Sequence, residues 1–213
     1  EALGIVFTAL DADAVLIVEA PDWKPPRRTE AALEAFAKLF DLRAKRALTG
    51  FANDTQQELA LLYDPYTVEA RHDPVGEGTG KKGSGQAPRF DGVFRIDLDI
   101  DAREDLVSFS KPPLEAELRL KGIEEVVRFI GVHIKSKAPH GARSKADATR
   151  IAIANRRKQL AQSIWLRHRV EQHLSAGEAL IVAGDFNDGP GLDEYEELFG
   201  RSGLEIVLGA DQP

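Results

Sequence analysis

The chain has 213 residues and a formal net charge of -7, a length that corresponds to one large domain or two small ones. The acidic balance argues against sequence-independent binding to nucleic acid, which requires a broad basic surface. The absence of cysteine excludes disulfides, thiolate metal sites and a cysteine nucleophile. No apolar run reaches the length of a membrane span, so we expect a soluble protein, either cytoplasmic or secreted.

The first half of the chain begins with helix and strand signals in alternation. We expect helices at residues 3–10 and 29–43, strands at residues 14–18, 59–63 and 66–70, and a mobile loop at residues 73–88. The run at residues 14–18 is continuously apolar, which predicts a buried strand, and it ends at Glu19.

The second half supplies further strands and a long helix. We expect strands at residues 94–100, 114–120, 126–132, 179–183 and 204–208, helices at residues 147–174 and 192–199, and a basic loop at residues 135–145. The basic residues Arg157, Lys158, Arg167 and Arg169 of the long helix are expected on an exposed face. Strands and helices are interspersed and several strands are hairpin-joined, which favours a layered α/β fold with mixed sheets.

Three apolar strands each end in a polar residue that suits phosphate chemistry: Glu19, His133 and Asp185. Taken singly, each has an ordinary structural interpretation as a turn residue, a helix cap or a satisfied histidine. Because rigid strands deliver all three in the same way, the sequence favours a shared site at a sheet edge.

The segment at residues 183–190 has the sequence AGDFNDGP, in which an apolar strand runs into a glycine and then Asp-x-Asn. In an extended stretch, Asp185 and Asn187 project to the same side. Their oxygen atoms and the amide donor suit a Mg²⁺-type site beside a phosphate. An Asx-rich turn is the alternative interpretation of the same residues.

This segment resembles the signature of the endonuclease/exonuclease/phosphatase superfamily, which has a DNase I-like, four-layer α/β sandwich with mixed β-sheets. Other segments resemble the family's motifs in the same order: the strand ending at Glu19, Ser110-Lys111-Pro112-Pro113-Leu114, His133-Ile134-Lys135-Ser136, and Arg156 to Gln159. The resemblance covers nearly the whole chain and implies a single domain over residues 1–213 that is incomplete at both ends.

The resemblance also implies roles for individual residues. Glu19 would coordinate a divalent cation, Mg²⁺ or Mn²⁺, together with Asp185, which would also orient the attacking water. Asn187 would hydrogen-bond a phosphate oxygen, and His133 would act at the scissile phosphate. Lys111, Lys135 and Arg156 would add positive charge around the substrate. The implied activity is phosphate ester hydrolysis, on a diester in nucleic acid or phospholipid or on a monoester.

Two departures from the family pattern keep a second interpretation open. The family's first strand, which carries an Asn, and its last Ser-Asp-His segment have no counterpart in the sequence, which also contains no methionine. We therefore expect the sequence to be part of a longer chain. The alternatives are a non-catalytic binding or scaffold module with the same fold, and a plain α/β domain in which Asp-x-Asn is coincidental. Substrate identity and oligomeric state stay open.

Overall fold

The structure is a computed structural model that describes residues 1–22, 24–55, 57–98, 104–189 and 200–209. The chain forms two compact units. Unit 1 consists of Glu1–Pro74, Ser110–Val132 and Ala176–Gly184, and unit 2 consists of Val75–Phe109, His133–Ser175 and Asp185–Pro213. The prediction of a single superfamily domain over residues 1–213 concerns the whole chain and stays a prediction.

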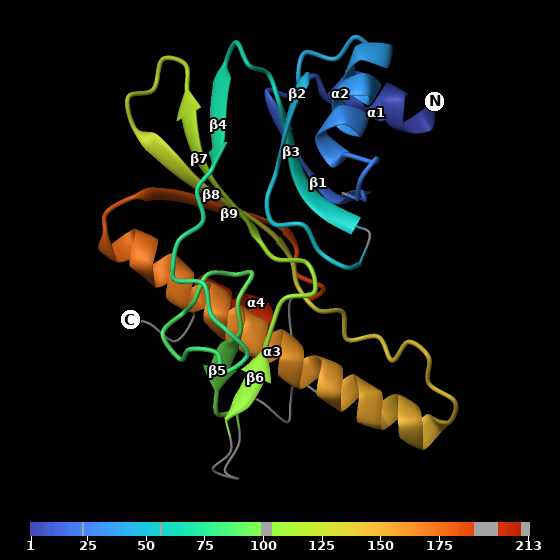
Figure 1. Ribbon diagram of the computed structural model, residues 1–213, viewed down its shortest axis with the longest axis vertical. Helices are drawn as coiled ribbons and strands as arrows, with labels where there is room; N and C mark the ends of the chain where they lie inside the picture. The colour runs from blue at the N-terminus through green and yellow to red at the C-terminus, as the bar shows by residue number, and fades with distance from the viewer. Residues whose placement is uncertain (23, 56, 99–103, 190–199, 210–213) are drawn as a thin grey trace. The chain divides into compact units, whose positions relative to one another are not determined.

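The first sheet of unit 1 is antiparallel and has the strand order β1-β3-β2, with β1 at Ala14–Pro21, β2 at Arg46–Thr49 and β3 at Gln57–Tyr63. After Gln57 and Glu58, the sequence of β3 is apolar from Leu59 to Tyr63, because this part of the strand is buried on both faces. Its alternate side chains Ala60 and Leu62 pack with Leu33 and Ala37 of α2 (Thr29–Leu39). Figure 1 shows α2 lying across this face of the sheet.

The other face of β3 packs against a second sheet of unit 1, with strand order β4-β7-β8-β9. The strands are β4 at Val68–His72, β7 at Leu114–Leu120, β8 at Val126–His133 and β9 at Ala179–Asp185. Leu59 and Leu61 of β3 form one buried cluster with residues of the second sheet, Val68, Leu114, Ala116, Leu118 and Phe129. Unit 1 is therefore layered as helix, sheet and sheet.

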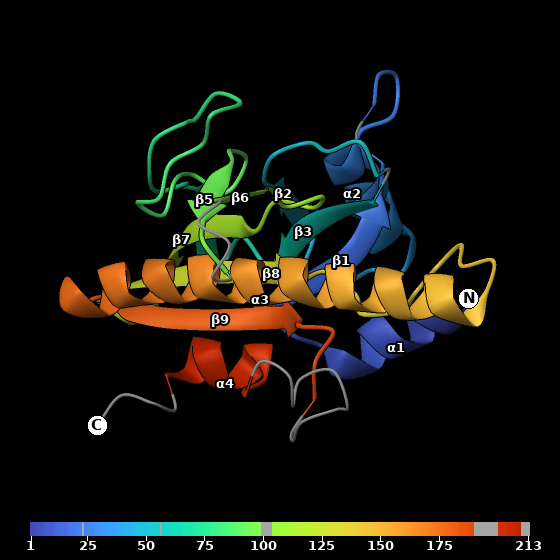
Figure 2. The same cartoon turned by 90° about the horizontal axis from the view of Figure 1, so that it is seen from below.

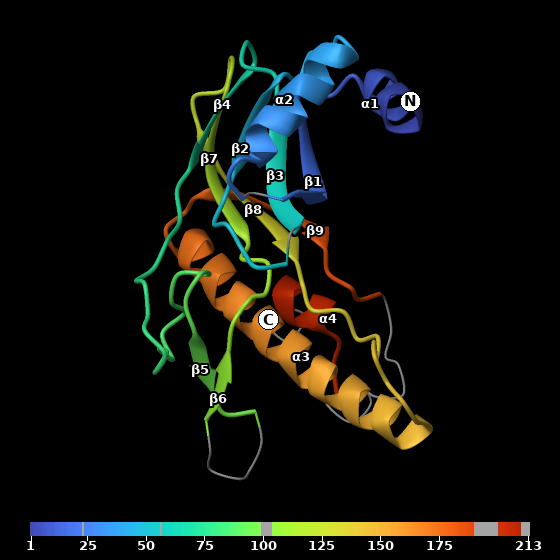
Figure 3. The ribbon, with the colours of Figure 1, turned by 45° about the vertical axis from the view of Figure 1, so that its right-hand side comes forward.

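Unit 2 is built around the long helix α3 (Lys145–Ser175), with a two-stranded sheet of β5 (Phe94–Ile96) and β6 (Asp105–Val107) and the short helix α4 (Gly203–Leu208). The core is aromatic: Trp165 of α3 is fully buried and its ring lies 5.1–5.4 Å from those of Phe90, Phe94 and Phe109. Figure 2 shows the length of α3, and Figure 3 shows the β5-β6 hairpin beside it.

The mixed α/β class predicted from the sequence is confirmed. The helix expected at residues 3–10 is α1 (Ala2–Leu10), and the strands expected at 59–63, 114–120 and 126–132 are confirmed within two residues. Two elements, β2 and β6, were not predicted, since each is only three or four residues long. The helix expected at residues 192–199 lies outside the described residues.

Several predictions were wrong. The helix expected to reach residue 43 ends at Leu39, and the strand expected at 66–70 lies at Val68–His72 because residues 65–67 form the turn. The strand expected at residues 204–208 is the helix α4. Arg169, expected on an exposed helix face, is fully buried and donates to the carbonyl oxygens of Val75, Ala87 and Pro88. It thereby anchors part of the loop that the sequence predicted to be mobile.

The apolar sequence of β9 is typical of a buried strand, but Ile181 at its centre is 49% exposed. In the described part of the chain β9 forms the edge of its sheet, which leaves one side of an apolar strand open. Among the helices of the described ranges, none combines the length and the apolar character needed to cross a bilayer.

Candidate functional site

The strands β8 and β9 end side by side and deliver His133 and Asp185 to the same edge. The backbone N–H of Ile134 donates to the carbonyl oxygen of Asp185 at 2.9 Å. The His133 Nε2 atom lies 3.7 Å from the Asp185 Oδ2 atom. The carboxyl-terminal ends of β8 and β9 therefore meet at one edge of the sheet, so the two strands run in the same direction. This parallel pair makes the sheet mixed. Two of the three predicted strand-end residues are therefore brought together.

The solvent exposure of the two side chains differs. The His133 side chain is 11% exposed, whereas that of Asp185 is 48% exposed. The imidazole is thus fixed by its surroundings while the carboxylate opens to solvent, where a water molecule or a substrate can reach it. A carboxylate and an imidazole within this reach form an arrangement that can orient a water molecule and transfer a proton.

Asn187 is held in a tight turn that begins at Asp185. The backbone N–H of Asn187 donates to Asp185 Oδ1 at 2.8 Å, an Asx-type turn. Asn187 has a φ of 49°, in the left-handed region that asparagine tolerates better than most residues. Its Nδ2 atom donates to the Ile134 carbonyl oxygen at 2.9 Å. The turn interpretation and the site interpretation of this segment are therefore compatible, because the turn is what fixes the Asn187 amide.

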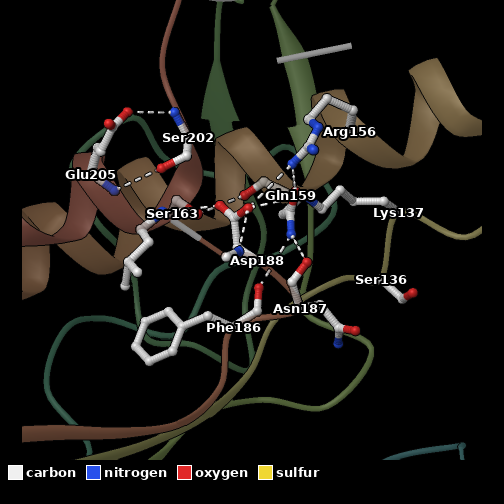
Figure 4. A network of polar contacts seen from close by, with 12 residues as sticks. Ser136, Lys137, Arg156, Gln159, Ser163, Phe186, Asn187, Asp188, Ser202 and Glu205 are labelled. Carbon is white, nitrogen blue, oxygen red and sulfur yellow. Dashed lines mark hydrogen bonds and ion pairs between the residues drawn. The ribbon is translucent and has the colours of Figure 1, made fainter. Parts of the chain in front are cut away.

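A glutamine of α3 holds the backbone of this turn in place. Gln159 Nε2 donates to the carbonyl oxygens of Phe186 at 3.2 Å and Asn187 at 2.9 Å. The Gln159 side chain is itself oriented by Arg156, whose Nη1 atom donates to Gln159 Oε1. Figure 4 shows these side chains converging on the turn. Arg156 is 3% exposed, so its position favours a role in orienting Gln159, and contact with a substrate stays a prediction for it.

Asp188 ties the turn to the elements around it, and no pattern in the sequence predicts a role for this residue by itself. Its side chain is 1% exposed, and Oδ1 lies 3.0 Å from Lys137 Nζ and 4.0 Å from Arg156 Nη1. Asp188 Oδ2 accepts from the backbone N–H of Leu204 in the first turn of α4 at 3.1 Å. The carboxylate therefore joins α4 and the loop after β8 to the Asp-x-Asn turn.

Glu19 and Lys111 lie in unit 1, at the end of β1 and just before β7. A bulge shifts the β1-β3 register between Val18 and Ala20, and Glu19 has a φ of 64°. Such a bulge re-aims a side chain out of the sheet, and the Glu19 side chain is 49% exposed. Lys111 Nζ donates to Glu19 Oε1 at 3.1 Å. Two of the predicted site residues are thus paired, while the predicted pairing of Glu19 with Asp185 spans both units and stays a prediction.

The side chains fit a hard divalent cation by donor type. Carboxylate oxygens such as those of Glu19 and Asp185 are the ligands that Mg²⁺ and Mn²⁺ prefer. The Lys111 ammonium beside Glu19 shows that this carboxylate accepts a cationic neighbour. In the residues that the structure describes, no three His, Asp or Glu side chains form a ready-made metal cluster.

Two lysines lie where the loop that follows β8 meets α3, one in the loop and one on the helix. The backbone N–H of Lys135, a predicted substrate-binding residue, donates to Gln162 Oε1 of α3 at 2.8 Å. Lys158 of α3 was expected on an exposed face, but it is partly buried. Burial lowers the pKa of the Lys158 ammonium, and the positive charge of Lys135 lowers it further.

Comparisons with known proteins gave matches among solved structures. No protein-family model and no curated protein matches the chain. Truncated Caenorhabditis elegans TDP2 is similar at 17% identity and a TM-score of 0.48, over 87% of this chain and 53% of that one. ANGEL2, a 2′,3′-cyclic phosphatase solved with adenosine-2′,3′-vanadate, is similar at 13% identity and a TM-score of 0.46, over 92% and 46%.

The human Nocturnin catalytic domain, solved with a bound sulfate, is similar at 15% identity and a TM-score of 0.44, over 95% of this chain and 62% of that one. The chain thus spans about half to three-fifths of the length of these neighbours. Each of these matches is a likeness in structure at low sequence identity, and the superfamily that the motifs of the chain resemble stays a prediction. A likeness at these identities and TM-scores supports no conclusion about activity, which has to be argued from the residues of the chain.

Proposed function

We propose that the chain carries a divalent-metal-dependent phosphoesterase site that hydrolyses a phosphate ester by in-line attack of water. The observation that carries this proposal is the arrangement at the shared end of β8 and β9. There His133 lies 3.7 Å from Asp185, and Asn187 is fixed by hydrogen bonds from both its backbone and its side chain. Phosphoryl transfer depends on positioning of the water and on neutralisation of charge on the phosphoryl oxygens, and these groups can supply both.

Asp185 and His133 are the groups that handle water and protons. Asp185 Oδ1 is engaged by the Asn187 N–H, and Oδ2 faces His133. The half-exposed carboxylate can accept a hydrogen bond from an approaching water and so orient it. The imidazole can then donate to a phosphoryl oxygen or to the leaving group, which is the contribution expected of general acid catalysis.

Asn187 and the nearby lysines are the groups that bind the phosphate. An amide NH₂ group carries two hydrogens, and one Asn187 hydrogen is used by the Ile134 carbonyl oxygen. The second hydrogen can be donated to a phosphate oxygen without loss of the contact that fixes the side chain. Lys135 on this side, and Lys111 beside Glu19, would add positive charge at the substrate.

Glu19 and Asp185 are the residues that would hold the divalent cation. When bound, Mg²⁺ or Mn²⁺ would neutralise phosphoryl oxygens and lower the pKa of the attacking water. Lys111 would then exchange its contact with Glu19 for contact with the substrate.

The test is hydrolysis of bis-p-nitrophenyl phosphate and of p-nitrophenyl phosphate by the full chain, with Mg²⁺, with Mn²⁺ and with EDTA. We expect turnover that depends on the metal and that falls about 10²- to 10⁴-fold in Asp185→Asn and in Glu19→Gln, since each removes one charged group without changing its size. The preferred ester would separate a diesterase from a monoesterase.

Matched controls are Glu77→Gln in unit 2 and Glu69→Gln on β4, both exposed carboxylates outside the site; these variants should retain turnover. Turnover that survives EDTA would remove the metal from the proposal. No turnover by the folded, metal-loaded protein on these esters and on nucleic acid would favour the non-catalytic binding module.

A further inference from the structure

A pair of lysines lies where the loop after β8 is fastened to α3. Two hydrogen bonds make this fastening: the Lys135 N–H donates to Gln162 Oε1 at 2.8 Å, and Asn155 Nδ2 donates to the Ala138 carbonyl oxygen at 2.9 Å. Lys158 is three residues after Asn155 and four before Gln162, so all three lie on one face of the helix. The helix register therefore places Lys158 between the two fastening points, alongside Lys135.

The charges of these two lysines are not balanced within the described ranges of the chain. Neighbouring cations have carboxylate partners: Lys137 Nζ lies 3.0 Å from Asp188 Oδ1, and Arg157 Nη2 lies 3.1 Å from Asp105 Oδ2. No ion pair of this kind involves Lys135 or Lys158 in the residues that the structure describes. Two ammonium groups that are partly buried and close enough to repel each other disfavour folding, and an anion bound between them would relieve this cost.

The lysine pair is adjacent to the candidate catalytic residues. Lys135 follows His133 by two residues, just after the end of β8, and Ile134 between them is buried. The Cα atoms of residues two apart in a chain are separated by at most about 7 Å. A group bound at the lysines is therefore one short step from a phosphate held at His133 and Asp185.

We propose that Lys135 and Lys158 form a binding site for a second phosphate group, carried by the substrate next to the scissile phosphate. The substrate class is then a phosphate ester with at least two phosphates, such as a nucleoside bisphosphate or a short oligonucleotide. This inference rests on the proposed function for the identity of the first phosphate. Lys158 on α3 acts as a specificity-determining residue, since it contacts the neighbouring group and not the reacting atoms.

The test is calorimetric titration of the full chain with a nucleoside 3′,5′-bisphosphate and with the matching 5′-monophosphate. We expect the wild type to bind the bisphosphate about 10-fold more tightly, and we expect Lys158→Met to lose that preference while its affinity for the monophosphate stays the same. Lys158→Arg should restore the preference. Lys145→Met is the matched control, because Lys145 is an exposed lysine in the first turn of α3. A trinucleotide serves as a third ligand. Its affinity, compared with that of the bisphosphate, shows whether the second phosphate site prefers an internal diester or a terminal monoester.

The stability of the variant separates a binding role from a structural one. Lys158→Met removes a repulsive charge but keeps the aliphatic stem, so its melting temperature should equal or exceed that of the wild type by about 1–3 °C. If Lys158→Met weakens the binding of the bisphosphate and the monophosphate equally, or weakens neither, the second phosphate site is overturned. Because binding is measured without turnover, a protein that prefers the bisphosphate yet hydrolyses nothing would support this site while the proposed function fails.

Discussion

At the scale of single residues, Asp188 is a buried side chain that ties the Asp-x-Asn turn to its surroundings and that the sequence did not single out. Asp185 and Asn187 could be chosen because Asp-x-Asn after an apolar strand is a recognisable pattern. Asp188 is one more polar residue in an Asp-Gly-Pro turn, and its importance comes from partners 51 and 16 residues away, Lys137 and Leu204. Long-range partners of this kind leave no local pattern in a sequence.

The first prediction at this scale concerns that carboxylate. Asp188→Asn keeps the shape of the side chain but removes the buried negative charge that lies beside Lys137 and Arg156. We expect the free energy of unfolding to fall by about 2–4 kcal/mol, since breaking a buried ion pair from one side is costly. Urea denaturation measures this change.

A surface ion pair of the same unit provides the comparison. Asp105 pairs with Arg157 at 3.1 Å, with side chains 38% and 37% exposed. Asp105→Asn should cost less than about 1 kcal/mol. Equal costs for the two variants would show that Asp188 does not hold the turn together.

At the scale of elements, α4 shows why a strand pattern failed. Residues 204–208 read LEIVL, an apolar segment with β-branched residues that favours a strand. The flanking residues decide otherwise: the Ser202 side chain accepts from the Glu205 N–H at 3.1 Å, and Glu205 Oε2 accepts from the Ser202 N–H at 2.9 Å. Gly209, with a φ of 73°, ends the helix. This capping box was legible in the sequence as Ser-x-x-Glu and outweighs the propensity of a short apolar run.

The prediction for this element is that the cap stabilises α4 measurably. Ser202→Ala removes the acceptor for the Glu205 N–H and should lower the free energy of unfolding by about 1 kcal/mol. Ser202→Thr preserves the hydroxyl and should cost only a few tenths of that amount. Hydrogen exchange of the α4 amides reports the loss locally, and equal protection in both variants would mean that packing against α3, and not the cap, holds the helix.

Other elements followed their patterns closely. The strands β3 and β7 and the helix α3 lie within two residues of the predicted bounds. The two strands have clear patterns, a continuous apolar run in β3 and an alternation of apolar and polar residues in β7. The prediction was poorer where an element is short, as for β2 and β6, or where burial depends on neighbours in space. Arg169 of α3 is such a case: three carbonyl oxygens of unit 2 satisfy a guanidinium that sequence position alone places on a polar face.

At the scale of the whole molecule, the sequence predicted the layered α/β class but not the division into two units, and the chemistry at the strand ends stays a prediction. The apolar strands of unit 1 build a two-sheet core, and an aromatic cluster around Trp165 builds the core of unit 2. Candidate site residues occur in both: Glu19 and Lys111 in unit 1, and His133, Asp185 and Asn187 in unit 2. The order of the motifs along the chain does not predict this division, because the boundary between the units falls within the last residues of β8 and β9.

In the proposed function, the side chains at the end of β8 and β9 act together on a phosphate ester. A double-mutant cycle tests it most directly: kcat for bis-p-nitrophenyl phosphate is measured with Mg²⁺ for His133→Ala, Asp185→Asn and the double variant. When two residues act as a unit, removing both lowers kcat by about as much as removing one of them. We expect each single variant to lose at least about 10²-fold in kcat and the double variant to lose less than about 10-fold more than the worse single one. Losses that multiply, or single variants within about threefold of the wild type, would contradict this expectation.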